Sequence, residues 1–257
     1  MRLTRVGRFL FALSFAATGV LTIVTRDFGL LWRPLAEQSP RHDSLAILAG
    51  ALLFATAAAL FINRTAQVAS LMLAAFLLLR ELVLQLPGVI NHPLVEASWY
   101  SASENLILLA GAWTISSLAP AGALARFRHA RAGQILFALA LPAIGLSHFF
   151  YLDQTAPLIP PWLPFHVPLA YLTGAAHIAA GAAILFDVLP RLAATLEAVM
   201  VSLFTLLVWG PMVSSHLTNR FDWSEICVST AIAGAAWAVA ESFRGRSWNF
   251  MRSTWPH

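Results

Sequence analysis

Lysine is absent from this 257-residue sequence, and sixteen arginines carry all of its side-chain basic charge apart from histidine. Charged residues make up only 11% of the chain, whereas 59% of the residues are hydrophobic. A soluble domain has about a quarter of its residues charged, and a chain of this length cannot bury so many apolar runs in water. The composition therefore predicts an integral membrane protein. We read the net charge of +4 as a topology signal and not as a nucleic-acid-binding surface.

Cysteine is almost absent as well, since Cys227 is the only one. A single cysteine excludes internal disulfides, CxxC redox exchange and thiolate metal sites. We interpret Cys227 as a small apolar residue in a helix. The sequence also contains no phosphate-binding GxxxxGKS loop, no HExxH and no GxSxG motif, which argues against nucleotide hydrolysis and zinc proteolysis.

Long apolar runs, bounded by charges or by proline and glycine, dominate the rest of the chain. They lie at about residues 6–25, 44–63, 66–86, 101–119, 131–152, 167–187, 191–213 and 223–243. Each is close to the roughly 20 residues that a helix needs to cross a bilayer. The sequence therefore predicts an all-α polytopic membrane protein with eight transmembrane helices. The basic, aromatic tail is expected at the membrane surface.

The two halves of the sequence resemble each other. Residues 5–19 align with residues 131–145 at a spacing of 126, and residues 45–59 align with residues 169–183 at a spacing of 124. The second spacing continues from there to Trp113 and Trp237. Such self-similarity predicts a structural repeat.

The predicted units are two four-helix bundles, residues 1–122 and 123–245, followed by a cytoplasmic tail at 246–257. Four is an even number, so the repeats should be parallel. Eleven arginines fall on the side of the two termini and four on the other side, and Arg80 lies within a span. The positive-inside rule then places both termini in the cytoplasm of a bacterial-type inner membrane.

Two histidines are expected to face protein. In the sixth span Gly174 and His177 share a face with other small residues, and in the fifth span Gly145 and His148 do the same. Each histidine can be a structural side chain bonded to a neighbouring carbonyl or hydroxyl, or it can bind a ligand. A metal site, drawing also on His166 and His216, is disfavoured because His148 and His177 are expected at different depths.

Arg80 and Glu81 lie deep in the third span, where ionisable groups are costly. Glu104 in the fourth span is the expected ion-pair partner of Arg80, with a substrate or anion site as the alternative. Asp153 and Glu225, at the outer ends of their spans, are expected to be solvated caps.

A family resemblance comes from the stretch GLSHFFYLDQTAPLIPPWLP and the following LAYLTGAAHIAAGAAILF. These segments resemble DoxX-family membrane proteins, whose pattern is G-x-x-H-F, a P-x-W-L-P loop and a Tyr/Thr-Gly-x-x-Glu stretch. His177 stands at the position of the family's glutamate. Members are usually single four-helix units, so this chain resembles a tandem fusion of two.

The resemblance implies a membrane subunit that associates with a quinone and with a redox partner protein. Here His148 and His177 are the expected ligand-facing groups, together with Arg80 and Glu104. The alternative is a small-molecule or lipid carrier, or a membrane-assembly factor, with a pocket between the two units. A purely structural subunit is a third possibility. Only the lipid bilayer is a firm partner, and no cofactor other than a quinone is implied.

Overall fold

All elements that the structure describes are helical. The computed structural model describes residues 4–28, 40–119 and 129–248. In chain order the elements are α1 (Thr4–Thr25), α2 (His42–Phe61), α3 (Ala66–Arg80), the π-helical turn η1 (Glu81–Gln85), α4 (Leu86–Asn91), α5 (Glu96–Leu118), α6 (Ala130–Phe150), α7 (Leu152–Thr155), the 3-10 turn η3 (Ala156–Leu158), α8 (His166–Leu185), α9 (Pro190–Phe204), the π-helical turn η4 (Thr205–Trp209), α10 (Gly210–Ser215) and α11 (Arg220–Ser242).

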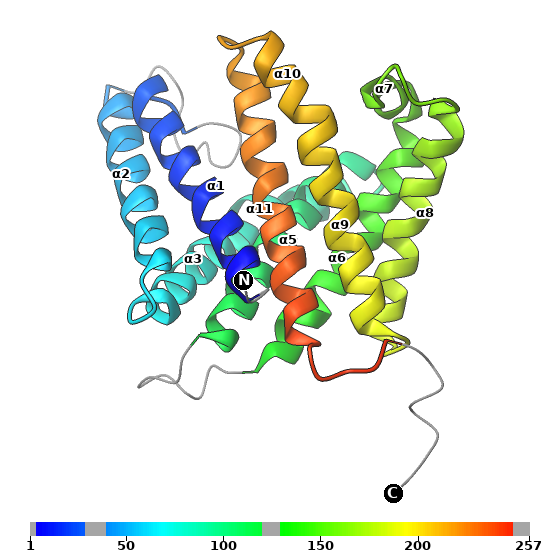
Figure 1. Cartoon of the computed structure of the whole chain (residues 1–257). Coiled ribbons are helices and arrows are strands. Elements are labelled where there is room, and N and C mark those ends of the chain that lie inside the picture. The colour runs from blue at the N-terminus through cyan, green and yellow to red at the C-terminus, as the bar shows by residue number, and fades with distance from the viewer. Residues whose placement is uncertain (1–3, 29–39, 120–128, 249–257) are drawn as a thin grey trace, which may run out of the picture.

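Within the part of the chain that the structure describes, seven helices are long and apolar enough to cross a membrane. They are α1, α2, the continuous helix from α3 to α4, α6, α8, the continuous helix from α9 to α10, and α11. The predicted all-α membrane architecture is confirmed to this extent. In Figure 1, α1 begins and α11 ends toward the same, lower side of the molecule.

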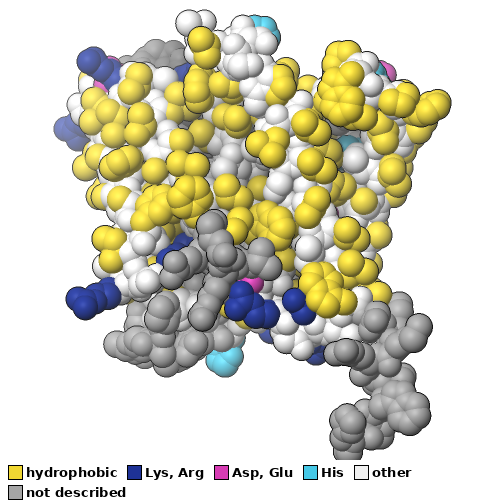
Figure 2. All heavy atoms as spheres, in the orientation of Figure 1, with side chains coloured by type: hydrophobic (Ala, Val, Ile, Leu, Met, Phe, Trp, Pro, Cys, Tyr) yellow, Lys and Arg dark blue, Asp and Glu magenta, His cyan; other side chains and the backbone are white. Residues whose placement is uncertain are grey.

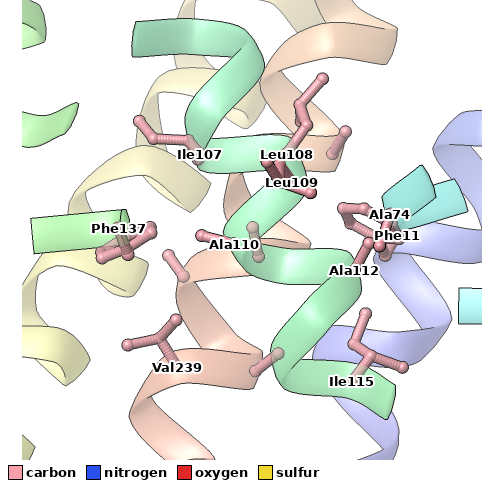
Figure 3. Packing of buried hydrophobic residues seen from close by; sticks show 14 of the residues in the cluster. Phe11, Ala74, Ile107, Leu108, Leu109, Ala110, Ala112, Ile115, Phe137 and Val239 are labelled. Atoms are coloured by element: carbon pink, nitrogen blue, oxygen red, sulfur yellow. The ribbon is translucent and has the colours of Figure 1, made fainter. Parts of the chain in front are cut away.

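Helix α5, at the fourth predicted span, is 23 residues long but is not among these seven. It runs through the centre of the core, where Phe11 of α1, Phe137 of α6 and Val239 of α11 surround it (Figure 3). Polar residues such as Asn105 and Thr114 are fully buried in it. A helix enclosed by other helices does not face lipid, so its side chains need not be apolar. The count of eight spans stays a prediction.

The sides of the molecule are apolar. Figure 2 shows hydrophobic side chains over the flanks of the helices, with arginines near the lower edge and at the upper left. The exposed apolar residues include Leu52, Met72, Leu139, Leu172 and Leu206. A protein that exposes this much apolar side-chain surface matches a lipid environment and not water.

The two longest helical runs share an irregularity. Each contains one π-helical turn, η1 and η4, and a proline follows each turn, at Pro87 and Pro211. A proline lacks an amide hydrogen and crowds the carbonyl four residues back, so a wider turn before it relieves both problems. The runs then end at His92 (φ −132°, ψ 59°) and His216 (φ −131°, ψ 62°) with nearly the same backbone angles.

Close helix contacts recur at the same spacings. A Cβ atom added to Gly7 of α1 would lie 2.8 Å from the carbonyl oxygen of Gly234 in α11. A Cβ atom added to Gly133 of α6 would lie 2.9 Å from the carbonyl oxygen of Ala110 in α5. Gly7 precedes Gly133 by 126 residues, and Ala110 precedes Gly234 by 124. Helix α1 therefore meets α11 in the way that α6 meets α5.

The small-residue stripe predicted in the sixth span is a helix contact. A Cβ atom added to Gly174 of α8 would lie 2.7 Å from the carbonyl oxygen of Gly145 in α6. The reverse addition to Gly145 would bring a Cβ atom to 2.5 Å from the carbonyl oxygen of Gly174. Real Cβ atoms do not approach backbone oxygens so closely. This pair of glycines therefore lets α6 and α8 touch, which confirms that the stripe faces protein.

Alanine at Gly174 is expected to lower the stability of the protein by about 1–3 kcal/mol, the usual cost of overpacking. The matched control is Gly88→Ala, because a Cβ atom there would meet nothing within 4 Å. In a helix that change should be neutral or stabilising by roughly 0.5–1 kcal/mol. The check is the thermal unfolding midpoint of both variants in detergent. Equal midpoints would contradict the close approach of α6 and α8.

Candidate functional site

A cavity of about 580 Å³ lies between α5, α6, α8, α9 and α11. Tyr151 and Ile159, in the proline-rich segment between α6 and α8, line one part of it, and His177 and Glu197 line another. Aliphatic and aromatic side chains form much of the wall. The volume and the mixture of an apolar wall with a few polar groups are those of a small-molecule site. In Figure 1, α7 lies at the upper end of α6 and α8, two of the helices that line the cavity.

His177 and Glu197 form a buried pair at the cavity. Nδ1 of His177 in α8 lies 2.7 Å from Oε1 of Glu197 in α9, and the two residues are only 3% and 2% exposed. The other carboxyl oxygen, Glu197 Oε2, is buried and has no hydrogen-bond partner among the described residues. Burying a polar oxygen without a partner is unfavourable. A hydrogen-bond donor that enters from the cavity, which Glu197 lines, would satisfy this oxygen.

His148 of α6 lies beside this pair. The centroids of the His148 and His177 rings are 5.4 Å apart, and both residues line the cavity. His148 Nδ1–H donates to the carbonyl oxygen of Ile144, at 3.1 Å. In the neutral ring this bond uses the only N–H, so Nε2 is left as an acceptor. The predicted inward orientation of both histidines is confirmed.

The expected difference in depth between the two histidines is wrong. His177 lies eleven residues into α8, about 16 Å along the helix, yet its ring is adjacent to that of His148 near the end of α6. The start of α8 must therefore lie well beyond the level of His148. Elements α7 and η3 occupy the step between the two helices.

Two more carboxyl groups line the cavity, those of Glu104 in α5 and Glu225 in α11. The hydroxyl of Tyr100 donates to Glu104 Oε1 at 2.8 Å, which orients that carboxylate. The sequence predicted Glu225 to be a solvated cap, and this is wrong because Glu225 faces the cavity. Asp153 is exposed, as expected for a cap.

Arg80 does not line the cavity and forms no ion pair with Glu104 among the contacts of the described residues. It is 8% exposed, and its Nη1 donates to Asn105 Oδ1 at 2.6 Å. Asn105 Nδ2 in turn donates to Glu81 Oε2 at 2.6 Å and to the carbonyl oxygen of Leu77 at 2.9 Å. The hydrogen-bond partner of Arg80 is thus Asn105, the residue after Glu104, because a step of one along α5 turns the side chain by about 100°. Asn105 faces α3, whereas Glu104 faces the cavity.

Sequence reasoning missed Glu197. Its signal was nonetheless present, since Glu197 is an isolated acid within the apolar run 191–213. An ionisable residue inside a membrane span is a functional candidate by itself. Its pairing with His177 depends on how α8 and α9 pack, which no sequence motif records.

Within the described residues, no group of three or more histidine, cysteine, aspartate or glutamate side chains is arranged to hold a metal ion. Comparison of the chain with protein-family models, with curated proteins and with solved structures found no match. The chemistry of the cavity therefore has to be argued from its own residues.

Proposed function

We propose that this integral membrane protein binds a small amphiphilic molecule in the cavity between α5, α6, α8, α9 and α11. The observation that carries the proposal is the buried His177–Glu197 pair, with an unpartnered carboxyl oxygen, in a cavity of about 580 Å³ that is otherwise largely apolar. A tail or ring system of the molecule would pack on the apolar wall, and its polar end would reach Glu197. This is the small-molecule or lipid carrier interpretation of the sequence.

The quinone-associated redox subunit remains the second candidate. The adjacent rings of His148 and His177 favour it, because histidine side chains bond the oxygen atoms of quinone-type molecules. An oxidised quinone has only acceptor oxygens. Nε2 of the neutral His148 ring is also an acceptor, so these two groups cannot form a hydrogen bond. The reduced quinol, with two hydroxyl donors, fits this group better. The redox partner protein stays a prediction from the family resemblance.

The architecture we propose is a tandem of two four-helix units, residues 1–122 and 123–245, with α5 as the fourth of eight spans. Recurring contacts support it: η1 and η4 lie 124 residues apart, and the α1–α11 contact has its equivalent in the α6–α5 contact. Contacts that recur in this reciprocal way are expected when two units are related by a pseudo-two-fold axis. The boundary itself falls at 120–128, outside the described residues. The DoxX-like assignment rests on the same units and on the segment from Gly145 to Phe186.

We also propose that both termini face the cytoplasm of a bacterial-type inner membrane. The excess of arginines on the side of the termini supports this orientation. The guanidinium of Arg191, at the start of α9, lies 4.0 Å from the ring centroid of Trp248, so the beginning of the tail contacts that side of the bundle. Residues 249–257 of the tail lie outside the described residues.

Native mass spectrometry of the protein released from lipid nanodiscs tests the binding function. We expect a bound molecule of defined mass on the wild-type protein and its loss in Val208→Trp, because Val208 lines the cavity. Leu206→Trp is the matched control, since Leu206 is on the same turn, η4, and faces outward. A bound quinol would favour the redox candidate. Equal adduct patterns in all three proteins would contradict the proposed cavity.

A further inference from the structure

Carboxyl groups are prominent among the polar groups of the cavity, and they indicate the chemistry of its ligand. Glu197 Oε2 is buried without a partner among the described residues, and Nε2 of the neutral His148 ring is an acceptor. Glu104 and Glu225 add further carboxyl oxygens. A molecule that satisfies these groups has to bring hydrogen-bond donors.

Several hydroxyl groups in the wall already donate to the protein. Tyr100 donates to Glu104 Oε1, at 2.8 Å. Ser147 donates to the carbonyl oxygen of Ile144 at 2.7 Å, and Thr173 donates to that of Ala170 at 2.8 Å. The other donors in the lining, such as Ser101 and Gln154, are neutral, so an anionic head group such as a carboxylate or a phosphate would meet carboxyl groups and no arginine among the described lining residues.

The charge balance points in the same direction. Among the described residues, three carboxyl groups and two imidazole rings line the cavity, so the carboxyl groups outnumber the rings by one. None of the described residues that line it is an arginine, and the chain has no lysine. Arg80, on α3, is bonded to Asn105 instead. An uncompensated carboxylate between apolar helices is costly unless a cation pairs with it.

We infer that the ligand is an amphiphile with a protonated amine head group, whose ammonium donates to Glu197 Oε2 and to His148 Nε2 and lies near the carboxylates of Glu104 and Glu225. This inference rests on the proposed binding function and names its ligand class. The ammonium supplies donors for these acceptors and a positive charge beside the carboxyl groups. The alkyl or ring portion lies against apolar side chains such as Ile107, Leu141 and Phe204.

Three probes with the same chain and different head groups separate the possibilities: octylamine, octanol and octanoate. An alkylamine is protonated at neutral pH, since its pKa is close to that of lysine, about 10.4. Affinities are taken from the rise of the thermal unfolding midpoint with probe concentration, in nanodiscs of phosphatidylcholine, which carry no net charge. Partition into empty nanodiscs is subtracted. We expect octylamine to bind at least about tenfold more tightly than octanol, and octanoate to bind most weakly.

Glu197→Gln keeps the shape of the side chain and an oxygen that accepts from His177, but it presents an amide donor to the cavity. We expect it to weaken octylamine binding by about 10- to 100-fold and to change octanol binding little. Glu241→Gln is the control, because Glu241 is also a buried carboxylate of the bundle and does not line the cavity. If Glu197→Gln does not fold, the order of the three probes on the wild-type protein decides the question.

Two results would overturn the amine inference. Equal binding of all three probes, lost together in Val208→Trp, would leave the cavity as a binding site and refute its preference for amines. Octylamine binding that is unchanged in Glu197→Gln would also refute it. The binding function itself would instead be contradicted if no probe bound and if Val208→Trp did not change the bound molecule seen by native mass spectrometry.

Discussion

Leucine in place of His177 is expected to lower the free energy of unfolding by about 3–5 kcal/mol, the usual cost of removing one partner of a buried ion pair. His177 makes the single hydrogen bond that the Glu197 carboxyl group has among the described residues, at 2.7 Å. Without it, both carboxyl oxygens would be buried and unpaired. The measurement is unfolding in SDS-containing micelles, followed by tryptophan fluorescence.

The double variant His177→Leu with Glu197→Leu should recover most of that loss. The positions 124 residues earlier hold Leu53 and Leu73, and Leu73 is buried in the core. The other half of the chain therefore has leucine at both of these positions, and Leu53 packs against the core cluster that contains Leu73. Replacing a buried charged pair by apolar side chains is often neutral or stabilising. A double variant as unstable as the single one would contradict the pairing, while loss of ligand binding in the stable double variant would show that the pair serves binding.

Phenylalanine in place of Arg80 is expected to lower the free energy of unfolding by a similar amount, about 3–5 kcal/mol. Arg80 donates to Asn105, and Asn105 donates to Glu81, so the three side chains form one chain of hydrogen bonds inside the bundle. Removing the guanidinium leaves the Glu81 carboxylate without the positive charge that compensates it. The unfolding assay described for His177 applies here as well.

The triple variant Arg80→Phe, Glu81→Thr, Asn105→Ser transfers the residues that stand 124 positions later, Phe204, Thr205 and Ser229. There the hydroxyl groups of Thr205 and Ser229 lie 2.7 Å apart and satisfy each other. We expect this neutral set to be accommodated at η1 as it is at η4, with most of the stability regained. A triple variant no more stable than Arg80→Phe would argue against equivalent environments in the two halves.

Much of the fold could be predicted from the sequence because bilayer thickness fixes helix length. Every apolar run became a helix, and the glycine spacing indicated which faces of α6 and α8 meet. The fourth run differs because α5 is enclosed by other helices, so its polarity reflects protein neighbours and not lipid. The apolar run at 101–119 predicted this helix, but hydropathy alone does not show that a helix lies at the centre of the bundle.

The candidate site could be predicted only in part. The residue pattern along one helix shows which face points inward, but it does not show which residues of the neighbouring helices that face contacts. Small residues on the same face gave the inward direction of His148 and His177. The sequence could not show that their rings are adjacent, since this depends on the step that α7 and η3 introduce. Nor could it distinguish Asn105 from Glu104 as the partner of Arg80, because that choice depends on the rotation of α5 about its own axis.

The most direct test of the central claim, that a ligand occupies the cavity beside His177 and Glu197, is photolabelling in membranes. An alkylamine carrying a diazirine in its chain is irradiated with the protein, and the labelled residues are identified by peptide mass spectrometry. The account predicts labels on cavity residues such as Ile144 and Tyr151, suppressed by excess octylamine. Labels confined to lipid-facing residues such as Leu139, and unaffected by the competitor, would contradict it.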